Sequence, residues 1–282
     1  MTRVVVTSDL HLGITTQEQI ETLVAAIAAE QPDLTVIAGD IGEGEANIRA
    51  CLALFQRLPG EVAVLGGNHD VWALSAPWKL GGPDSQEMWE RVLPGAVRDA
   101  GMRWLEEETW RSYGLAVAGS IAWYDYTGAA EDIPQQTEAY WTELKRRTLP
   151  NGRFINPDAK FINWPWSDIE FATARANALA KRVEQLEADP GIEAILLVTH
   201  MPIFREQLVV KPDVPTWGYT NAFFANLTLG KLVRELGKLR AVISGHTHVP
   251  RDSQHVVGNR LIPVKVVKSD FRTPGAIIFD YP

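Results

Sequence analysis

The sequence has a single cysteine and no apolar run long enough to span a membrane. Cys51 is the only thiol among 282 residues, so no disulfide forms within the chain, and the apolar stretch 50–55 around it predicts a buried, unreactive side chain. No window approaches the ~18 apolar residues of a membrane span, and the N-terminus lacks the apolar region of a signal peptide. We therefore expect a cytoplasmic protein without a membrane partner.

Basic residues are also scarce, since 27 Lys and Arg stand against 35 Asp and Glu, a net charge of −8. Proteins that grip long nucleic acids need clustered Lys and Arg, so a nucleic-acid polymer is a poor candidate partner. A small anionic substrate remains compatible, because a bound metal ion supplies positive charge locally. The composition, 46% hydrophobic, is typical of a globular protein with a substantial core.

Strands and helices alternate through the first third of the chain. Short apolar runs predict strands at 3–7, 34–38 and 61–65. Two helices separate them, one after a capping box formed by Thr15 and Glu18, and one over 46–58. This alternation is typical of βαβ units and a parallel sheet, and it favours an α/β fold.

The remainder of the chain has a looser pattern at first and regular elements again towards its end. Nine of the ten tryptophans lie between Trp72 and Trp166, and we interpret residues 120–167 as an insertion or lid on a single domain that spans 1–282. After it, Ser167 and Glu170 form a capping box that opens a long helix. The further elements that we expect are strands at 109–113, 115–119, 194–199 and 240–244, a helix at 222–236, and antiparallel hairpins built from 254–257, 260–266 and 276–280.

Histidine is rare but its placement is regular. Five of the six histidines directly follow predicted strands, each next to Gly, Asp or Asn; they are His11, His69, His200, His246 and His248. Ligands of open α/β sheets bind outside the carboxyl ends of the strands, so these histidines can meet at one edge. The sixth, His255, has no partner motif and is expected to be structural.

Acidic and amide side chains follow the same strand ends. Asp9 lies two residues before His11, a spacing that points both side chains the same way in extended backbone. Asp40 follows the second strand and Asn68 follows the third. Carboxylate, imidazole and amide ligands suit Mn, Fe, Zn or Co better than Ca²⁺, and seven of them fit two ions that share a bridge. Such paired ions assist hydrolysis of a phosphate ester.

These motifs resemble the calcineurin-like metallophosphoesterase superfamily. The matching segments are Asp9-x-His11, Gly39-Asp40, Gly67-Asn68-His69-Asp70, His200 after a strand, and Gly245-His246-Thr247-His248. The resemblance implies a four-layer αββα sandwich of two mixed sheets flanked by helices. It implies two metal ions, Mn²⁺, Fe²⁺/Fe³⁺ or Zn²⁺, and attack on phosphorus by a bridging hydroxide.

The resemblance also assigns roles to single residues. One metal takes Asp9, His11, Asp40 and His248, and the second shares Asp40 and takes Asn68, His200 and His246. His69 resembles the proton donor to the leaving alkoxide, and Asp70 its partner, which fixes the imidazole and raises its pKa. Four residues near these strand ends are candidates for contact with substrate: Trp72, Trp123, Tyr124 and Asp125.

Departures from the superfamily's patterns narrow the choice of activity. Protein phosphatases carry Gly-Asp-x-x-Asp-Arg-Gly and an Arg before Gly-Asn-His, but here Asp40 is followed by Ile-Gly-Glu-Gly, and Gly66 takes the place of that Arg. The motif forms are most similar to those of bacterial cyclic-nucleotide phosphodiesterases, which predicts cleavage of a small phosphodiester. The alternatives are a phosphomonoesterase, a DNA-repair-type nuclease and a non-enzymatic scaffold.

Overall fold

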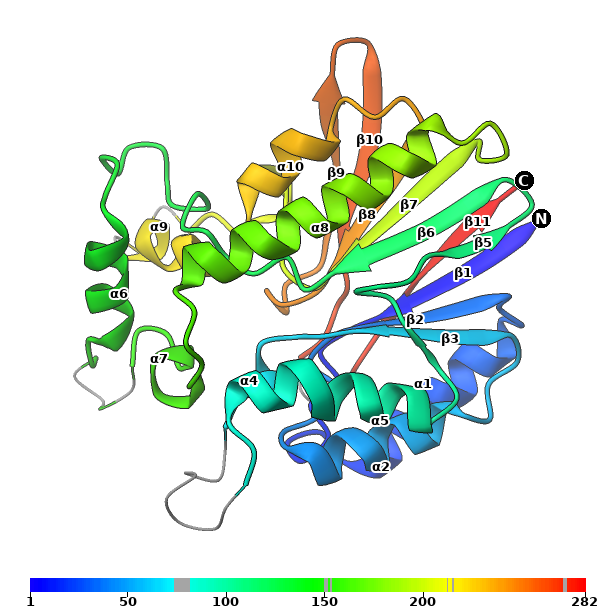
Figure 1. Ribbon diagram of the computed structural model, residues 1–282, viewed down its shortest axis with the longest axis horizontal. Coiled ribbons are helices and arrows are strands. Elements are labelled where there is room, and N and C mark those ends of the chain that lie inside the picture. The colour runs from blue at the N-terminus through cyan, green and yellow to red at the C-terminus, as the bar shows by residue number, and fades with distance from the viewer. Residues whose placement is uncertain (74–81, 150–151, 153, 212, 215, 271–272) are drawn as a thin grey trace.

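Two β-sheets form the centre of the computed structural model, which describes residues 1–73, 82–149, 152, 154–211, 213–214, 216–270 and 273–282 (Figure 1). In the first sheet, β1, β2, β3 and β4 are parallel and β11 is antiparallel to β1, in the order β11-β1-β2-β3-β4. Its strands are β1 (Thr2–Thr7), β2 (Leu34–Ala38), β3 (Glu61–Leu65), β4 (Arg103–Trp104) and β11 (Ala276–Tyr281).

The second sheet has the order β5-β6-β7-β8-β10-β9. Strands β6, β7, β8 and β10 are parallel, whereas β5 and β9 pair antiparallel with β6 and β10. Its strands are β5 (Trp110–Ser112), β6 (Leu115–Ser120), β7 (Ala194–Thr199), β8 (Leu239–Ser244), β9 (Arg251–Val257) and β10 (Arg260–Val266). Both sheets are therefore mixed, with a parallel centre.

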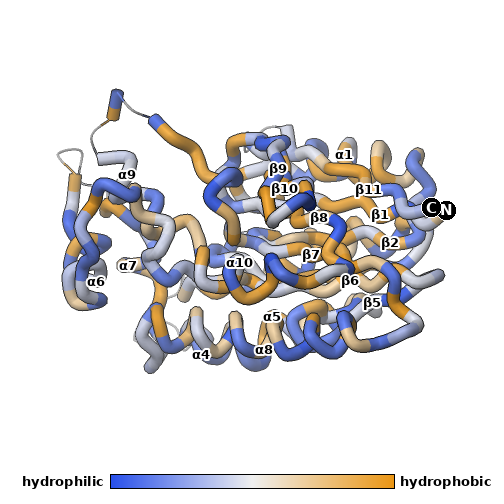
Figure 2. Tube along the Cα trace, turned by 90° about the horizontal axis from the view of Figure 1, so that it is seen from above, coloured by the Kyte–Doolittle hydropathy of each residue, from blue (hydrophilic) through white to orange (hydrophobic). Residues whose placement is uncertain are grey.

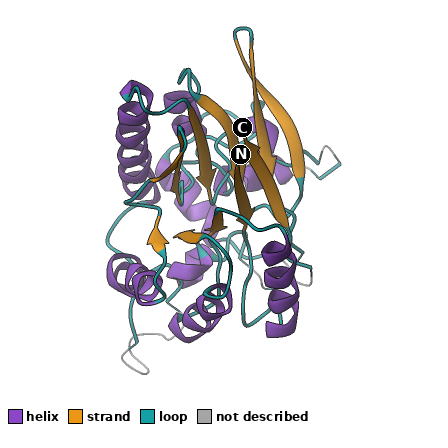
Figure 3. Cartoon of the chain, turned by 90° about the vertical axis from the view of Figure 1, so that its right-hand side faces the viewer, coloured by secondary structure: helices purple, strands orange, loops and turns teal. Residues whose placement is uncertain are grey.

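Apolar side chains on alternate residues pack the sheets together and against helices. Val4 and Val6 of β1 join a core cluster between the sheets with Val36 of β2 and Val198 of β7. Val5, which points to the opposite face, belongs to a second cluster shared with the helices. Figure 3 shows the two sheets between helices, and Figure 2 shows hydrophobic residues concentrated in the strands. The arrangement confirms the predicted αββα sandwich.

Several helices lie on the outer faces of the two sheets. Helices α1, α2 and α5 cover the first sheet, and α8 and α10 cover the second (Figure 1). The helical segments are α1 (Gln17–Ala29), α2 (Glu45–Phe55), η1 (His69–Val71), α4 (Ser85–Glu87), η2 (Met88–Val92), α5 (Leu93–Asp99), α6 (Glu138–Arg146), α7 (Asp158–Phe161), α8 (Asp168–Ala188), η3 (Arg205–Gln207), α9 (Trp217–Thr220), η4 (Asn221–Phe223) and α10 (Leu227–Val233). None of the helices in the described part of the chain is long and apolar enough to cross a membrane.

The segment between β6 and α8 extends away from the sheets. It contains α6 and α7, which lie beside α9 at one side of the molecule in Figure 1. Residues 150, 151 and 153 of the predicted insertion lie outside the described residues. Ser167 caps α8 as predicted, because its side chain accepts a hydrogen bond from the backbone N of Glu170, and the Glu170 side chain accepts one from the backbone N of Ser167.

Three local predictions are wrong. The first capping box is formed by Thr16 and Gln19, one residue beyond Thr15 and Glu18. The helix expected at 222–236 is shorter, since α10 spans only Leu227–Val233. It begins after Asn226, whose side chain caps it by accepting from the backbone N of Leu229. The segment 276–280 does not extend the hairpin β9–β10. It pairs with β1 at the edge of the other sheet.

Candidate metal centre

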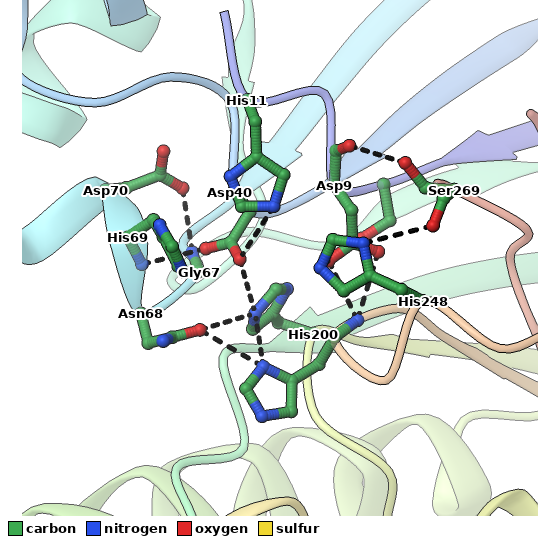
Figure 4. Close-up of polar contacts among 12 residues, drawn as sticks. Asp9, His11, Asp40, Gly67, Asn68, His69, Asp70, His200, His248 and Ser269 are labelled. Atoms are coloured by element: carbon green, nitrogen blue, oxygen red, sulfur yellow. Dashed lines mark hydrogen bonds and ion pairs between the residues drawn. The ribbon is translucent and has the colours of Figure 1, made fainter. Parts of the chain in front are cut away.

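The seven predicted metal ligands converge at the carboxyl ends of the strands of both sheets. Four of them follow strands of the first sheet, namely Asp9 and His11 after β1, Asp40 after β2 and Asn68 after β3. The other three follow strands of the second sheet, namely His200 after β7 and His246 and His248 after β8. Figure 4 shows side chains from both sheets facing one another across the small space between these loops.

The ligand atoms form two groups that share Asp40. Asp9, His11, Asp40 and His248 bring one nitrogen or oxygen atom each to within 4.8 Å of one another, and so do Asp40, His200 and His246. The Asp40 carboxylate is the link, because its Oδ2 lies 3.5 Å from both His11 Nε2 and His200 Nε2. The two groups match the two ligand sets that the superfamily resemblance implies.

Asn68 completes the second group with its amide oxygen. Asn68 Oδ1 lies 3.1 Å from His200 Nε2 and 3.1 Å from His246 Nδ1. A carbonyl-type oxygen beside two imidazole nitrogens is a suitable ligand for a divalent cation of the first transition series.

The backbone at these ligands is unusual. Residues with positive φ include Asp9 (56°), His11 (46°), Asp40 (53°), His246 (68°) and His248 (58°). Side chains other than glycine rarely adopt this region, and such strain concentrates at functional sites. The extended conformation that the sequence predicts for the Asp9–His11 pair is therefore wrong, although both side chains still reach the centre.

Two glycines allow the strand ends to approach. Gly39 has φ +85°, and a Cβ atom there would lie 2.7 Å from both Gly67 N and His200 Nδ1. A Cβ atom on Gly67 would overlap the backbone N and the carboxylate of Asp40. Any larger residue at either position would push apart the loops that carry the ligands.

Hydrogen bonds to backbone carbonyls orient two of the imidazoles. His200 Nδ1 lies 2.9 Å from the Ala38 carbonyl oxygen, and His248 Nδ1 lies 3.0 Å from that of Ser269. Because a carbonyl oxygen only accepts, Nδ1 carries the proton and Nε2 keeps its lone pair for a cation. His248 Nε2 lies 3.7 Å from Asp9 Oδ1, on the side of the first ligand group.

The electrostatics of the centre also suit cations. Burial lowers the pKa of His200 to about 4 and also lowers the pKa values of His11 and His246. These imidazoles are therefore neutral at pH 7, the form that binds metal. Burial, with the nearby charges of Asp70 and Asp9, raises the pKa of Asp40 well above its usual value despite the opposing effect of His69. A cation beside Asp40 would favour its carboxylate, so the donor set fits two divalent ions.

His69 lies next to this ligand set with a carboxylate partner of its own. Its backbone N donates to Asp40 Oδ1 at 2.8 Å, and its Nδ1 lies 3.1 Å from Glu43 Oε1. The Trp72 ring stacks on the imidazole, with centroids 3.6 Å apart and planes 29° apart. Burial lowers the pKa of His69, but the charge of Asp40 and the hydrogen bond to Glu43 outweigh burial and raise it to about 9.

The carboxylate that holds His69 is Glu43, and the predicted pairing with Asp70 is wrong. Asp70 Oδ1 accepts from the backbone N of Ile41 at 2.8 Å and of Gly42 at 3.3 Å, and its Oδ2 accepts from Gly67 N at 2.8 Å. Asp70 therefore ties the loop after β2 to the loop after β3. Burial raises its pKa to about 6, against the lowering effect of these N–H groups.

Three of the four candidate substrate contacts are buried, and the fourth, Asp125, is half-buried. Trp123 and Tyr124 are fully buried, and Trp72 is 6% exposed, so these rings pack inside the fold. Asp125 Oδ1 accepts from the backbone N of Thr127 at 3.1 Å and from its hydroxyl, which closes a local turn. Trp123, Tyr124 and Asp125 thus make contacts within the fold, whereas Trp72 packs against His69. Their contact with substrate stays a prediction. His255 pairs with Glu206 Oε1 at 3.0 Å, the structural role expected for it.

Sequence reasoning missed Glu43 and Asp158. Glu43 stands three residues after Asp40, where protein phosphatases carry the second Asp of their motif, and this spacing could have identified it. Asp158 lies in the insertion, and its Oδ1 accepts from Asn68 Nδ2 at 2.9 Å. No motif surrounds Asp158, and 90 residues separate it from Asn68, so local patterns could not reveal this contact.

A comparison with protein families agrees with this geometry. The profile of the calcineurin-like phosphoesterases matches residues 2–250, which include all seven candidate ligands. The chain belongs to this family. Calcineurin-like phosphoesterases use a dinuclear centre of divalent metal ions, and this chain holds the corresponding ligand groups at one place.

Individual relatives share the fold at low sequence identity. The acyl-carrier-protein phosphodiesterase PptH of Mycobacterium tuberculosis is 24% identical over 254 residues, which cover 86% of this chain and 71% of PptH. The crystal structure of PptH, a phosphopantetheinyl hydrolase, aligns with a TM-score of 0.71 at 19% identity, over 95% of this chain and 89% of that chain. A dimetal phosphatase from Danio rerio aligns with a TM-score of 0.54 at 12% identity, over 95% and 87% of the two chains.

Proposed function

We propose that this protein is a metal-dependent phosphodiesterase that uses His69 as its proton donor. The observation that carries the proposal is the position of Asp40, which belongs to both ligand groups and also accepts the backbone N–H of His69. The ligands of the two cations are Asp9, His11, Asp40, Asn68, His200, His246 and His248. The ions themselves are Mn²⁺, Fe²⁺/Fe³⁺ or Zn²⁺, according to the mixture of carboxylate, imidazole and amide donors.

The division of labour follows from the geometry. When bound, the two cations supply Lewis acidity to the phosphoryl group and activate water for attack. His69 holds a proton that it can give to the departing oxygen, because Glu43 fixes the imidazole through Nδ1 and leaves Nε2 for transfer. Trp72 covers one face of the imidazole and restricts its rotation. Protonation of the leaving oxygen matters most when that oxygen belongs to an unactivated alcohol.

The substrate class that we propose is a phosphodiester with such an alcohol as leaving group. The named activities of PptH, an acyl-carrier-protein phosphodiesterase and phosphopantetheinyl hydrolase, support a carrier protein bearing phosphopantetheine as the first substrate to test. A cyclic nucleotide, which the motif forms favour, is the small-molecule alternative.

The first test compares bis(p-nitrophenyl) phosphate with p-nitrophenyl phosphate in the presence of Mn²⁺. We expect turnover of the diester, and its loss on chelation with recovery when Mn²⁺ is restored. Activity restricted to the monoester would indicate a phosphomonoesterase, and no metal-dependent turnover of either would favour a scaffold. A second assay incubates the enzyme with a phosphopantetheinylated carrier protein or with 3′,5′-cyclic AMP. Mass spectrometry detects loss of phosphopantetheine from the carrier protein, and chromatography of the nucleotide detects hydrolysis of cyclic AMP.

A further inference from the structure

The insertion between β6 and α8 reaches the metal centre through one buried carboxylate. Asp158 is the first residue of α7 and is 1% exposed. Its Oδ1 accepts from two side chains, Asn68 Nδ2 at 2.9 Å and Trp72 Nε1 at 2.7 Å. Asn156 fixes the start of α7, because its Oδ1 accepts from the backbone N of Asp158 at 2.8 Å. One oxygen of the insertion therefore holds two residues of the loop after β3.

The first of these bonds determines which end of the Asn68 amide faces the centre. An amide group has a donor end and an acceptor end of nearly the same shape. With Nδ2 donating to Asp158, Oδ1 points towards His200 Nε2 and His246 Nδ1, at 3.1 Å from each. Without an acceptor at Asp158, a rotated amide would direct N–H groups, which cannot bind a cation, into the ligand set.

The second bond fixes the ring that lies on His69. Trp72 stacks on His69 with ring centroids 3.6 Å apart, and it also stacks on Phe161 of α7 with centroids 4.5 Å apart. Its indole N–H, donated to Asp158, sets the rotation of the ring about this stack. The His11 and His69 rings also meet in a T-shaped arrangement, with centroids 4.5 Å apart and planes at 81°. The position of the imidazole thus depends on Trp72, and the position of Trp72 depends on α7.

Backbone bonds reinforce the contact between the insertion and this loop. Ala73 N donates to the Phe161 carbonyl oxygen at 2.9 Å, and Ser85 N donates to that of Asn163 at 3.2 Å. Asp158 is therefore held in place by its surroundings before any substrate binds. A preorganised second layer of this kind is what orients metal ligands and proton donors in enzymes.

We propose that Asp158 is a positioning residue that orients Asn68 towards the metal ions and, through Trp72, orients His69 towards the leaving group. The proposal rests on the proposed function, since it assigns Asp158 to the ligand and the proton donor of that site. It gives the insertion a definite task in catalysis, although the residue itself touches neither metal nor substrate.

The test compares Asp158→Ala with Asp158→Asn in the purified protein. The alanine variant removes the acceptor, so we expect about 10–100-fold weaker Mn²⁺ affinity, the usual effect of losing such a partner. The asparagine variant keeps an acceptor oxygen, so its Mn²⁺ affinity should stay within about threefold of that of wild type. Mn²⁺ titrations with metal analysis give the affinity independently of turnover. Wild-type affinity in Asp158→Ala would overturn the proposal.

Asp168 offers a matched control within the same region. It is also a buried carboxylate that accepts from an indole, with Trp123 Nε1 3.0 Å from its Oδ1, and it pairs with Lys145. Its hydrogen bonds hold the insertion without including Asn68 or Trp72. Asp168→Ala should therefore lower stability and leave Mn²⁺ affinity close to wild type. If both alanine variants lose affinity equally, general loosening of the insertion explains the result, and the proposal fails.

Trp72→Phe separates the two branches and serves as the test if Asp158→Ala does not fold. Phenylalanine keeps a ring against His69 but removes the bond to Asp158. We expect unchanged Mn²⁺ affinity and about tenfold slower turnover of a diester with an unactivated alcohol leaving group. Turnover of bis(p-nitrophenyl) phosphate should change much less, and equal losses on both substrates would contradict the proposal. An inactive wild-type protein would instead refute the proposed function, so the two failures are distinguishable.

Discussion

Asp40 and His69 illustrate how single residues define the centre. Asp40 Oδ2 lies 3.5 Å from an imidazole nitrogen of each ligand group, while its Oδ1 accepts the backbone N–H of His69. The same carboxylate therefore links the two candidate ligand sets and fixes their distance to His69, the proposed proton donor. Glu43 and Trp72 then set the orientation of the His69 ring. Glu43 acts through a hydrogen bond and Trp72 through stacking, so separate variants can test the two contributions.

His69→Ala tests the proton donor directly. We expect this variant to retain both metal ions and to lose about 10²–10⁴-fold in turnover of a diester with an unactivated alcohol leaving group, the usual contribution of a general acid. The loss for bis(p-nitrophenyl) phosphate should be much smaller, because nitrophenolate leaves without a proton. Steady-state rates on both substrates, with metal analysis of each preparation, measure the difference.

His255→Ala is the control for this prediction. His255 also pairs with a glutamate, and it stacks on Phe204 with centroids 4.1 Å apart. Removing it should leave the ratio of the two rates as in wild type. A similar loss on both substrates in His69→Ala would count against the role of His69.

At the scale of elements, residues with strong local patterns are predicted well. The bounds of β2, β3, β7 and β10 agree with the sequence to the residue. The runs of β2 and β3 are short, apolar and followed directly by glycine, which makes their ends visible. The helix α8 starts where Ser167 caps it. Its boundary can be read from the sequence because the cap depends only on residues three apart.

Elements that carry helix-breaking residues, or that depend on distant partners, could not be predicted. The sequence does not indicate helix α5, because Pro94 and Gly95 both disfavour helices. Pro94 is tolerated because it lies in the first turn of α5. The edge strand β11 finds β1 across the whole chain, a pairing that periodicity alone does not specify. The same division holds for the site. The seven candidate ligands follow strand ends and are visible in the sequence, whereas the contact from Asp158 to Asn68 exists only in the folded chain.

Ser167→Ala tests the boundary between the insertion and α8. The change removes the side-chain acceptor for Glu170 N, and we expect the free energy of unfolding to fall by about 1 kcal/mol, the usual cost of losing an N-cap. Ser167→Asn should preserve most of the stability, because asparagine is an equally good cap. Denaturant unfolding of the three proteins measures the difference. An alanine variant as stable as wild type would show that packing alone sets this helix boundary.

At the scale of the whole molecule, the metal centre joins the two sheets. Loops after β1, β2 and β3 supply candidate ligands from one sheet, and loops after β7 and β8 supply them from the other. Bound cations should therefore act as cross-links of the folded state, since the unfolded chain does not hold the ligands together. Mn²⁺ at 100 times its dissociation constant should add about 2.7 kcal/mol to the free energy of unfolding for each of the two sites. Denaturant unfolding with Mn²⁺ and with a chelator measures this increment.

In Asp40→Asn, Mn²⁺ should raise the free energy of unfolding much less than in wild type, because the proposed shared ligand is no longer a charged carboxylate. The matching change in an exposed residue, Asp99→Asn, removes only a surface ion pair with Arg49. This variant should keep the full stabilisation by Mn²⁺. Equal stabilisation by Mn²⁺ in Asp40→Asn and wild type would mean that the metal binds elsewhere on the protein.

Glu106 provides a second connection between the sheets, and this connection is sensitive to pH. It is buried in the turn after β4, and its Oε1 accepts from the backbone N of Ile121, which follows β6. Arg182 of α8 donates to the carbonyl oxygens of Leu105 and Gly119 on either side, at 2.8 Å and 2.6 Å. Burial raises the pKa of Glu106 from 4.5 to about 7, although Arg175 and Arg182 partly oppose it.

The raised pKa predicts the direction of a pH effect on stability. The neutral carboxyl is favoured in the folded state, so its contribution is fully present below pH 4.5 and is lost as the pH rises through about 7. Glu106→Gln keeps an acceptor for Ile121 N but cannot ionise. The stability of this variant relative to wild type should therefore increase from pH 4.5 to above 7, by on the order of 3 kcal/mol. Denaturant unfolding of both proteins at several pH values measures this difference. The control is Glu107→Gln, since Glu107 is a neighbouring residue that forms an exposed ion pair with Arg98. A difference that does not change with pH would show that Glu106 ionises as readily in the folded protein as in the unfolded chain.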